Sequence, residues 1–283
     1  MSFSRFIYSD CILEFSAISF KEGWLLKVLS MRIFREIEVW GTVLIVDIAS
    51  PILSQKELEE GIREVTTLVN RVDHLFSTYK EDSQVSKIRR DELMIGEANS
   101  EVIEVWNLCE EMKALTSGAF DPWSVIGGFD PSGLVKGWGA DKCADLLTSR
   151  GIEHVLINAA GDLTLRGGEL IDSEVQPWMI GISDPENVDN VVKTYEIFDG
   201  AIATSGDYEK GAHIHDPYTG LIAIGAKSVS IVGPNGAIAD ALATAVMVSG
   251  IDGAPWFDQP ELREYEVFAI NRHHRTSWSY SHA

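Results

Sequence analysis

The feature that most constrains this chain is an apolar helix that carries a carboxylate. Residues 238–246 read IADALATAV, in which Asp240 and Thr244 are the only polar side chains. A helix that is apolar on every side belongs inside a protein, and a buried carboxylate without compensation costs several kcal/mol. The sequence therefore predicts a buried helix over about 236–249 and a group that compensates the charge of Asp240.

Two explanations for Asp240 fit the sequence. Asp240 lies one helical turn before Thr244, so the two side chains point the same way. Their oxygens are hard ligands of the kind that magnesium or calcium takes. The alternative is that the helix dipole stabilises Asp240 while the Thr244 hydroxyl bonds back to a backbone carbonyl. The spacing alone leaves both explanations open.

The remaining segments mix helical and strand-like patterns. Residues 37–50 resemble one strand with Gly41 as a bulge or weak point. Ser54 and Glu57 form a capping box, and the apolar spacing that follows, up to Phe76, predicts an amphipathic helix. Further helices are expected from Ser100 to about Gly118 and over 137–149, and strands near 155–168 (a pair), 178–182, 192–198, 227–233 and 266–270, with a turn-rich segment at 204–220.

This order of elements predicts the fold class and the domain organisation. Helices and strands that mix without regular alternation favour an α+β architecture over a doubly wound sheet. We expect mixed β-sheets flanked by helices in one compact unit over residues 35–283. Residues 1–34 are expected to be an N-terminal extension of uncertain order, and Met31 is an alternative start.

The net charge, the N-terminal sequence and the cysteines limit which partners and which cellular location are expected. The 283 residues include 23 basic and 43 acidic ones, for a net charge of −20. Such a protein is repelled by a phosphate backbone, so no nucleic-acid partner is expected. Charges interrupt the apolar N-terminus, which argues against a secretory signal, and no apolar run is long enough for a membrane anchor. With Cys11, Cys109 and Cys143 read as reduced thiols, a cytoplasmic location is expected.

The segment FDPSGLVKGWGAD (129–141) is a candidate anion site. It places Gly133 and Lys136 where a helix begins, so backbone amides and an ammonium group lie close together. The spacing is not that of a Walker A motif, and no GxGxxG follows a strand. A P-loop and a Rossmann cofactor site are therefore disfavoured.

The segment HIHDPYTG (213–220) is the second candidate. It sets His213, His215 and Asp216 beside a turn, where they could act as acid, base or ligand. An ordinary surface turn explains it equally well. Three further loops are small and polar, as loops that contact phosphates or rings often are: STYKEDSQVSKI (77–88), SGAFDP (117–122) and ATSGDY (203–208).

Eight motifs follow one another over roughly residues 36–250. They are WGT (40–42), STYKEDSQVSKI (77–88), SGAFDP (117–122), DPSGLVKGWGAD (130–141), NAAGDL (158–163), ATSGDY (203–208), HIHDPYTG (213–220) and ADALATA (239–245). In type and order they resemble the motifs of the ApbE family, the FAD:protein FMN transferases. The resemblance implies an ApbE-like, T-fold-like domain.

The resemblance also implies a reaction and its ligands. Members bind FAD with Mg²⁺ at the diphosphate, transfer FMN to a threonine or serine hydroxyl of a target protein, and release AMP. Metal ligands are implied at Asp240, at Thr244 and at a backbone carbonyl at or near Gly133. Flavin contacts are implied at Trp40, Tyr79, Ala119, Phe120, Asp121, Asp130, Lys136 and His215.

The reaction implied by this resemblance needs a base for the attacking hydroxyl. His213 is the first candidate, because histidine accepts a proton near neutral pH, and Asp216 is the second. A divalent cation would stabilise the negative charge that develops on the phosphate oxygens. Two alternatives keep the same site: hydrolysis of FAD to FMN and AMP, and FAD binding without catalysis.

The chain departs from the family pattern at three places. Residues 159–162 (AAGD) carry alanine for the first glycine of the GGD turn, and residues 130–133 (DPSG) replace DxGG. Only seven residues separate Pro122 from Asp130, where many members have a longer insertion. A shorter segment over the site is therefore expected.

Overall fold

The structure is a computed structural model that describes residues 3–8, 11–16, 30–206, 214–273 and 276–282. In chain order its elements are β1 (Phe3–Tyr8), β2 (Cys11–Ser16), β3 (Met31–Val39), β4 (Thr42–Ser50), α1 (Gln55–Phe76), α2 (Gln84–Arg89), η1 (Ile95–Glu97), α3 (Ser100–Leu115), α4 (Ser132–Ser149), β5 (His154–Ala159), β6 (Asp162–Arg166), β7 (Glu169–Ile171), β8 (Glu174–Gln176), β9 (Trp178–Asp184), β10 (Asn187–Ile197), β11 (Gly200–Gly206), β12 (Ser228–Gly233), α6 (Gly236–Ser249), η2 (Gly250–Asp258), β13 (Glu266–Ile270) and β14 (Ser277–Ser281).

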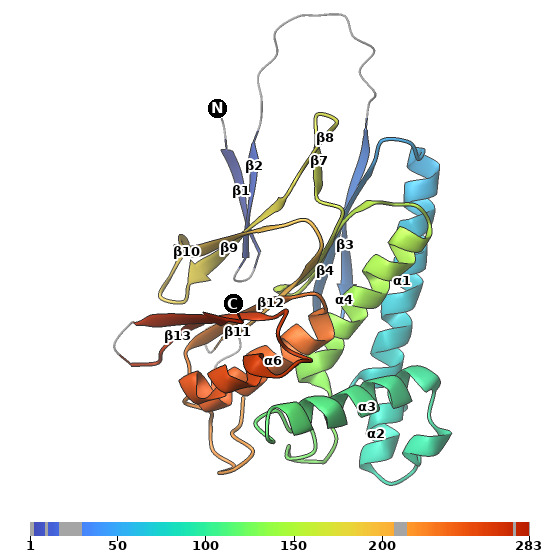
Figure 1. Cartoon of the computed structure of the whole chain (residues 1–283). Coiled ribbons are helices and arrows are strands. Elements are labelled where there is room, and N and C mark those ends of the chain that lie inside the picture. The colour runs from blue at the N-terminus through green and yellow to red at the C-terminus, as the bar shows by residue number, and fades with distance from the viewer. Residues whose placement is uncertain (1–2, 9–10, 17–29, 207–213, 274–275, 283) are drawn as a thin grey trace, which may run out of the picture.

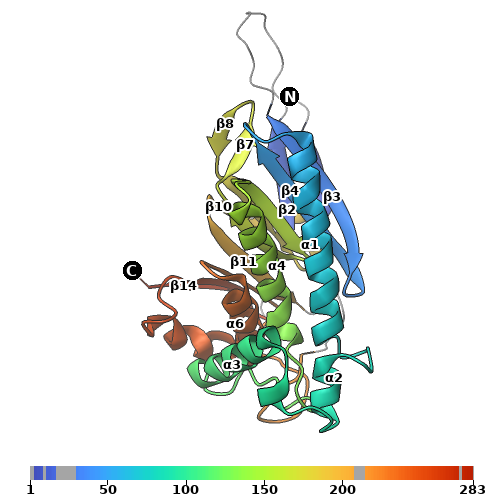
Figure 2. The same ribbon diagram turned by 90° about the vertical axis from the view of Figure 1, so that its right-hand side faces the viewer.

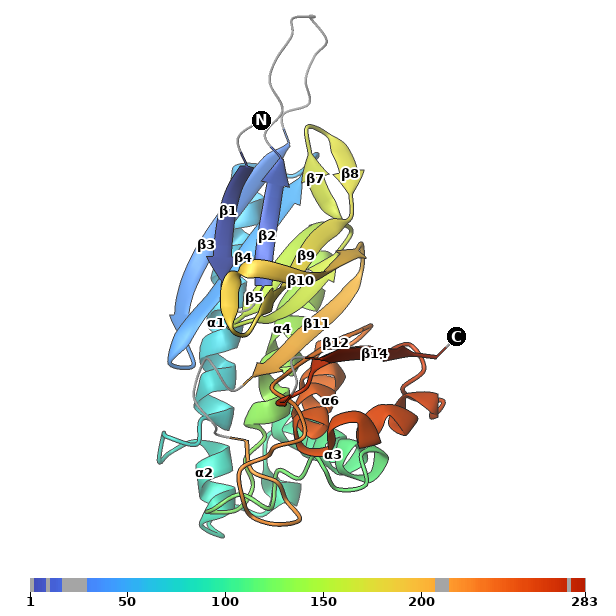
Figure 3. The ribbon, with the colours of Figure 1, turned by 90° about the vertical axis from the view of Figure 1, so that its left-hand side faces the viewer.

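The molecule has three layers built around an eight-stranded sheet. That sheet has the order β14-β13-β12-β11-β6-β5-β4-β3, and each neighbouring pair is antiparallel. Helices α1, α4 and α6 cover one face (Figures 1 and 2). A smaller sheet, β1-β2-β9-β10, covers the other face (Figure 3). The predicted α+β class is confirmed, and these pairings are uniformly antiparallel rather than mixed.

Each interface between layers has its own apolar core. The larger core lies between the helices and the eight-stranded sheet and includes Leu44, Val65 and Leu242. The smaller one joins the two sheets through residues such as Leu156, Trp178 and Ile180. Burial of both sheet faces explains why β5 is buried along its whole length.

Helix α1 begins where local sequence signals place it. Ser54 Oγ accepts a hydrogen bond from the Glu57 N–H, and the Glu57 carboxylate accepts one from the Ser54 N–H. The apolar residues of the predicted stripe face the sheet and are buried, among them Leu58, Val65 and Val72. The capping box and the spacing therefore predicted this helix correctly.

Helix α6 is the buried helix that the apolar run predicted. Ten of its residues are buried, and Asn235 caps it by accepting a hydrogen bond from the Ile238 N–H. Because η2 continues it, the stretch Gly236–Asp258 is long and apolar enough to cross a membrane by length and composition. No run of this length was expected from the sequence. Within its most apolar window 61% is buried inside the fold, as in the core helix of a globular protein.

Several boundaries differ from the sequence predictions. Residues 37–50 do not form one strand, because Trp40 and Gly41 both have positive φ and make the turn of a hairpin between β3 and β4. Helix α4 starts five residues earlier than expected, and the turn-rich segment begins inside β11. The boundary expected after residue 34 falls inside β3, and β2 pairs with β9. Helix α2, the β7–β8 hairpin and β14 had no counterpart in the predictions.

Candidate functional site

The candidate site forms where α4 and α6 approach each other most closely. A Cβ at Gly137 of α4 would lie 2.1 Å from the Gly236 carbonyl oxygen, so the two backbones touch there. Asp141, also on α4, accepts hydrogen bonds from the Gly236 and Ala237 N–H groups at 2.8 and 3.2 Å. These contacts fix the start of α6, and with it the position of Asp240, against α4.

The three predicted metal positions lie in this contact. Asp240 is 2% exposed, and Thr244 is half-buried one turn later. Gly133 has φ −83° and ψ 19°, which breaks the regular helix at the start of α4. A Cβ at Gly133 would lie 3.0 Å from Thr244 Oγ1. Glycine therefore leaves room beside the threonine hydroxyl that any other residue would fill.

The donor chemistry at this place suits a hard divalent cation. One carboxylate, one hydroxyl and the backbone carbonyls at the bend of α4 are all oxygen donors. Within the described residues, no group of three or more His, Cys, Asp or Glu side chains gathers in one place. A cation bound to Asp240 would thus need hydroxyl and backbone oxygens as its other protein ligands.

Lys136 lies between two buried carboxylates. It forms an ion pair with Asp162, and its Nζ lies 3.9 Å from Asp240 Oδ1. The side chains of Asp162 and Asp240 are each 3% exposed, while that of Lys136 is 27% exposed. Asp162 Oδ1 also accepts a hydrogen bond from the Thr204 N–H of β11 at 3.3 Å. The lysine therefore combines internal ion pairs with access to a ligand from solvent.

Asp162 belongs to the NAAGDL motif (158–163), but it was not among the site residues predicted from the sequence. In the structure Ala160 and Gly161 have φ 55° and 100° and form the turn between β5 and β6. Asn158 Oδ1 accepts a hydrogen bond from the Gly161 N–H and closes this turn. The turn delivers Asp162 to Lys136, 26 residues away in sequence. An acidic residue directly after a tight turn was the available signal.

The loop after α3 places Phe120 beside the same contact. Ala119 and Phe120 are buried, and the Phe120 ring lies 3.4 Å from the Cβ position of Gly133. Asp121 accepts a hydrogen bond from the Trp123 N–H at 3.0 Å and pairs with Lys113 at 2.7 Å. The Phe120 ring therefore borders the candidate site, whereas Asp121 faces the α3 side.

The shortened segment between Pro122 and Asp130 is held from both sides. The Asp130 N–H donates to the Pro122 carbonyl at 2.8 Å, and Arg89 of α2 donates to the Ile126 and Gly127 carbonyls. Asp130 Oδ1 accepts a hydrogen bond from the Ser132 N–H at 3.0 Å, next to the start of α4. Asp130 thus orients the residues that precede Gly133.

Trp40 and Tyr79, two predicted flavin contacts, have different surroundings. The Trp40 indole packs on Gly139 of α4, 2.9 Å from its Cβ position, and donates a hydrogen bond to the Val69 carbonyl at 3.3 Å. Tyr79 is 96% exposed. Trp40 therefore packs within the fold, whereas the Tyr79 ring is exposed to solvent.

The predicted catalytic segment is described only in part. His213 lies outside the described residues. His215 is exposed and lies opposite Ile222 in an isolated antiparallel bridge. Both carboxylate oxygens of Asp216 accept hydrogen bonds within its own turn, from the Tyr218 N–H at 2.8 Å and the Thr219 hydroxyl at 2.9 Å. In this arrangement Asp216 orders the turn.

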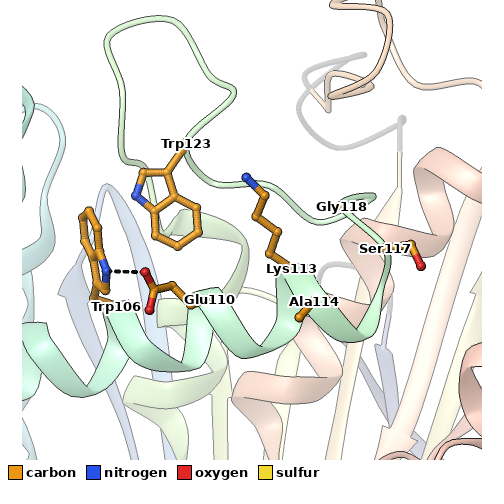
Figure 4. A pocket seen from close by; sticks show the side chains of 7 residues that line it. All are labelled: Trp106, Glu110, Lys113, Ala114, Ser117, Gly118 and Trp123. Atoms are coloured by element: carbon orange, nitrogen blue, oxygen red, sulfur yellow. Dashed lines mark hydrogen bonds between the residues drawn. The ribbon is translucent and has the colours of Figure 1, made fainter.

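A separate pocket of about 590 Å³ lies between helix α3 and the loop that follows it (Figure 4). The Trp106 indole donates a hydrogen bond to Glu110 at 3.1 Å, and the Lys113 ammonium lies 5.5 Å from the Trp123 ring centre. None of the predicted site residues lines this pocket, whose walls are Trp106, Glu110, Lys113, Ala114, Ser117, Gly118 and Trp123.

Comparisons with known proteins agree on one family. The model of the ApbE family matches residues 40–125 and 127–268. The FAD:protein FMN transferase of Vibrio cholerae serotype O1 is 29% identical, over 66% of this chain and 72% of that protein. Enzymes with the same name from Rhodobacter capsulatus and Escherichia coli K12 are 35% and 33% identical over 44% of this chain, but the matches cover only 25% and 38% of those proteins.

Solved structures show the same fold. The flavin transferase ApbE from Vibrio cholerae superposes with a TM-score of 0.77 at 23% identity, over 89% of this chain and 98% of that one. The ApbE protein from Thermotoga maritima gives a TM-score of 0.75 at 23% identity, over 88% and 97% of the two chains. With a family model that matches most of its length, this chain belongs to the ApbE family.

Proposed function

We propose that this protein is a magnesium-dependent FAD:protein FMN transferase. It takes FMN from FAD, attaches it to a threonine or serine hydroxyl of an acceptor protein, and releases AMP. The observation that carries this proposal is the meeting of Asp240, Thr244, Gly133 and Lys136 at the contact of α4 and α6. Its support from relatives is the name FAD:protein FMN transferase, which the matched proteins share.

Each residue of this group has a distinct part in the proposal. Asp240, Thr244 and the backbone at Gly133 would hold Mg²⁺, which supplies Lewis-acid stabilisation of the diphosphate when bound. Lys136, at the start of α4, offers its ammonium to the diphosphate oxygens. The buried Phe120 ring beside Gly133 would keep water from one side of the site.

The transfer is a single nucleophilic displacement at phosphorus. The acceptor hydroxyl oxygen forms a bond to the phosphorus of the FMN phosphate, and the bond from that phosphorus to the oxygen of the AMP phosphate breaks. The hydroxyl proton passes to a base. His213 is our first candidate, because Asp216, the second, already accepts two hydrogen bonds within its own turn.

The test is incubation of the purified protein with FAD, Mg²⁺ and a threonine-bearing acceptor protein. Mass spectrometry reports FMN added to the acceptor, and chromatography reports AMP. We expect both products from the wild type and neither from Asp240→Ala. Asp145→Ala is the matched control, since Asp145 lies on α4 with a side chain that is 65% exposed.

Three outcomes separate the proposal from its alternatives. AMP together with free FMN and no labelled acceptor would indicate a hydrolase. FAD that is bound and never cleaved would indicate a flavin-binding protein. Full labelling by Asp240→Ala would refute the metal role of that carboxylate.

A further inference from the structure

Within the described part of the chain, Lys136 pairs more closely with Asp162 than with Asp240, although Asp162 is not among the residues that we assign to FAD or to the metal. The ammonium forms a direct hydrogen bond with Asp162, whereas its distance to Asp240 Oδ1 is 3.9 Å. Asp162 is itself fixed at the start of β6 and accepts a hydrogen bond from the Thr204 N–H. One cationic side chain is therefore shared unequally by two buried carboxylates.

We propose that Asp162 is a positioning residue: it draws the Lys136 ammonium toward β6, so that a divalent cation rather than the lysine neutralises Asp240. This inference rests on the proposed function, because it assumes a cation at Asp240. It assigns Asp162 no contact with FAD. Its effect on the reaction passes through Lys136 alone.

Electrostatics explains why the sharing matters. The attraction between two opposite charges rises as their distance falls, and it is screened weakly when both carboxylates are buried. A lysine carries its ammonium on a flexible four-carbon stem, so the charged group can shift between neighbouring carboxylates. If Asp162 lost its charge, the ammonium would move onto Asp240, and an incoming cation would have to displace it.

A purely structural role for Asp162 makes a different prediction. Asp162 also links β6 to β11 through the Thr204 N–H, and that link is independent of Lys136. A loss of this link would disturb the site whether or not the lysine were present. Removal of Lys136 therefore separates the two explanations in a double-mutant cycle.

The experiment measures Mn²⁺ binding by electron paramagnetic resonance, with the metal alone and with ADP, which carries a diphosphate but no FMN. The variants are Asp162→Asn, Lys136→Met and the double variant. Asp145→Asn controls for the loss of one negative charge at an exposed position of α4. We expect Asp162→Asn to weaken the binding of Mn²⁺ alone by about tenfold, equal to about 1.4 kcal/mol, and Lys136→Met to strengthen it. With ADP, Lys136→Met also removes a cation from the diphosphate, so the cycle is evaluated with the metal alone.

The double variant decides the mechanism. In the Lys136→Met background, Asp162→Asn should change Mn²⁺ affinity by less than about twofold. Equal weakening in both backgrounds would overturn the inference in favour of a structural role, and no weakening in either would overturn it as well. Wild-type protein that takes up no Mn²⁺ with or without ADP would also refute it.

This readout does not depend on the transfer reaction. If the wild type fails to label any acceptor while the Mn²⁺ cycle behaves as expected, the proposed transfer is wrong and the role of Asp162 stands. If labelling succeeds and the cycle fails, only the inference about Asp162 is lost.

Discussion

The Tyr218 hydroxyl donates a hydrogen bond of 2.9 Å to the Ser117 carbonyl, although the two residues are 101 positions apart. This contact fastens the turn that contains Asp216 to the loop that leads from α3 to Phe120. Tyr218 is 62% exposed, and its ring also lies 3.8 Å from the Cβ position of Gly118. Two motifs of the candidate site are thus tied together by one side chain.

Tyr218→Phe should weaken FAD binding severalfold with little effect on stability. The hydroxyl contributes about 1 kcal/mol at most, as an exposed hydrogen bond does, but its loss lets the turn move relative to the Phe120 ring. Flavin fluorescence titration measures the affinity, and urea unfolding measures the stability. Tyr280→Phe is the control, because it removes a comparable hydrogen bond to Asp258. Equal FAD affinity in all three proteins would contradict the prediction.

Gly133→Ala should raise the Mg²⁺ concentration that the reaction requires. Its φ of −83° suits alanine, so the backbone is not strained. The new methyl group would lie 3.0 Å from Thr244 Oγ1 and 3.4 Å from the Phe120 ring, which crowds the proposed metal position. A Mg²⁺ titration of AMP release tests this.

Gly96→Ala provides the matched control for this substitution. A Cβ at Gly96 meets nothing within 4 Å, so we expect the titration curve and the free energy of unfolding to stay at the wild-type values. A Gly133→Ala curve that coincides with that of Gly96→Ala would show that Gly133 is not next to the cation.

Helix α1 and helix α6 were predictable because their signals are local. The capping box at Ser54 and the apolar spacing that follows lie within one continuous stretch of sequence, so they can be recognised without knowledge of any tertiary contact. The run around Asp240 likewise contains its own evidence of burial. Eight short motifs, each recognisable from local sequence, together indicated the family through their order along the chain.

Contacts between distant residues were not predictable in this way. The strand propensity of residues 37–50 gave no sign of the turn at Trp40, where a tryptophan has positive φ and its ring packs on Gly139 across the fold. The pairing of Lys136 with Asp162 depends on the β5–β6 turn and on the bend of α4 together. Neither follows from spacing along the chain.

Cys109 and Cys143 should resist thiol reagents until the protein unfolds. Both are fully buried in helices, and burial raises the pKa of each thiol far above its usual value. The reactive thiolate is therefore scarce in the folded state. Labelling with Ellman's reagent at pH 8 tests this in a Cys11→Ser variant, which removes the third thiol. Rapid labelling of either helix cysteine without denaturant would contradict this burial.

Asp141 joins three elements at the start of α6. Its Oδ1 accepts a hydrogen bond from the Thr164 hydroxyl at 2.8 Å, and its Oδ2 accepts those of the Gly236 and Ala237 N–H groups. Asp141 is buried, with 6% of the residue exposed. Burial raises the pKa of Asp141 from 3.8 to about 6, against the opposite effect of these hydrogen bonds.

This raised pKa predicts how stability depends on pH. Between pH 3.8 and about 6 the folded state holds the Asp141 proton more tightly than the unfolded state does. The stability that protonation contributes is therefore complete below the unfolded pKa and is lost as pH rises through about 6. In Asp141→Asn, which cannot ionise, this loss should be absent.

Urea unfolding of the wild type and of Asp141→Asn at a series of pH values checks the prediction. Asparagine loses part of the hydrogen bonding at every pH, which gives a constant offset. On top of that offset, the variant should gain about 2 kcal/mol relative to the wild type from pH 4 to pH 7, which is most of the free energy equivalent to the pKa shift. A difference that stays constant across this range, or that grows in favour of the wild type, would mean that the hydrogen bonds from Thr164 and the start of α6 outweigh burial and hold the carboxylate ionised.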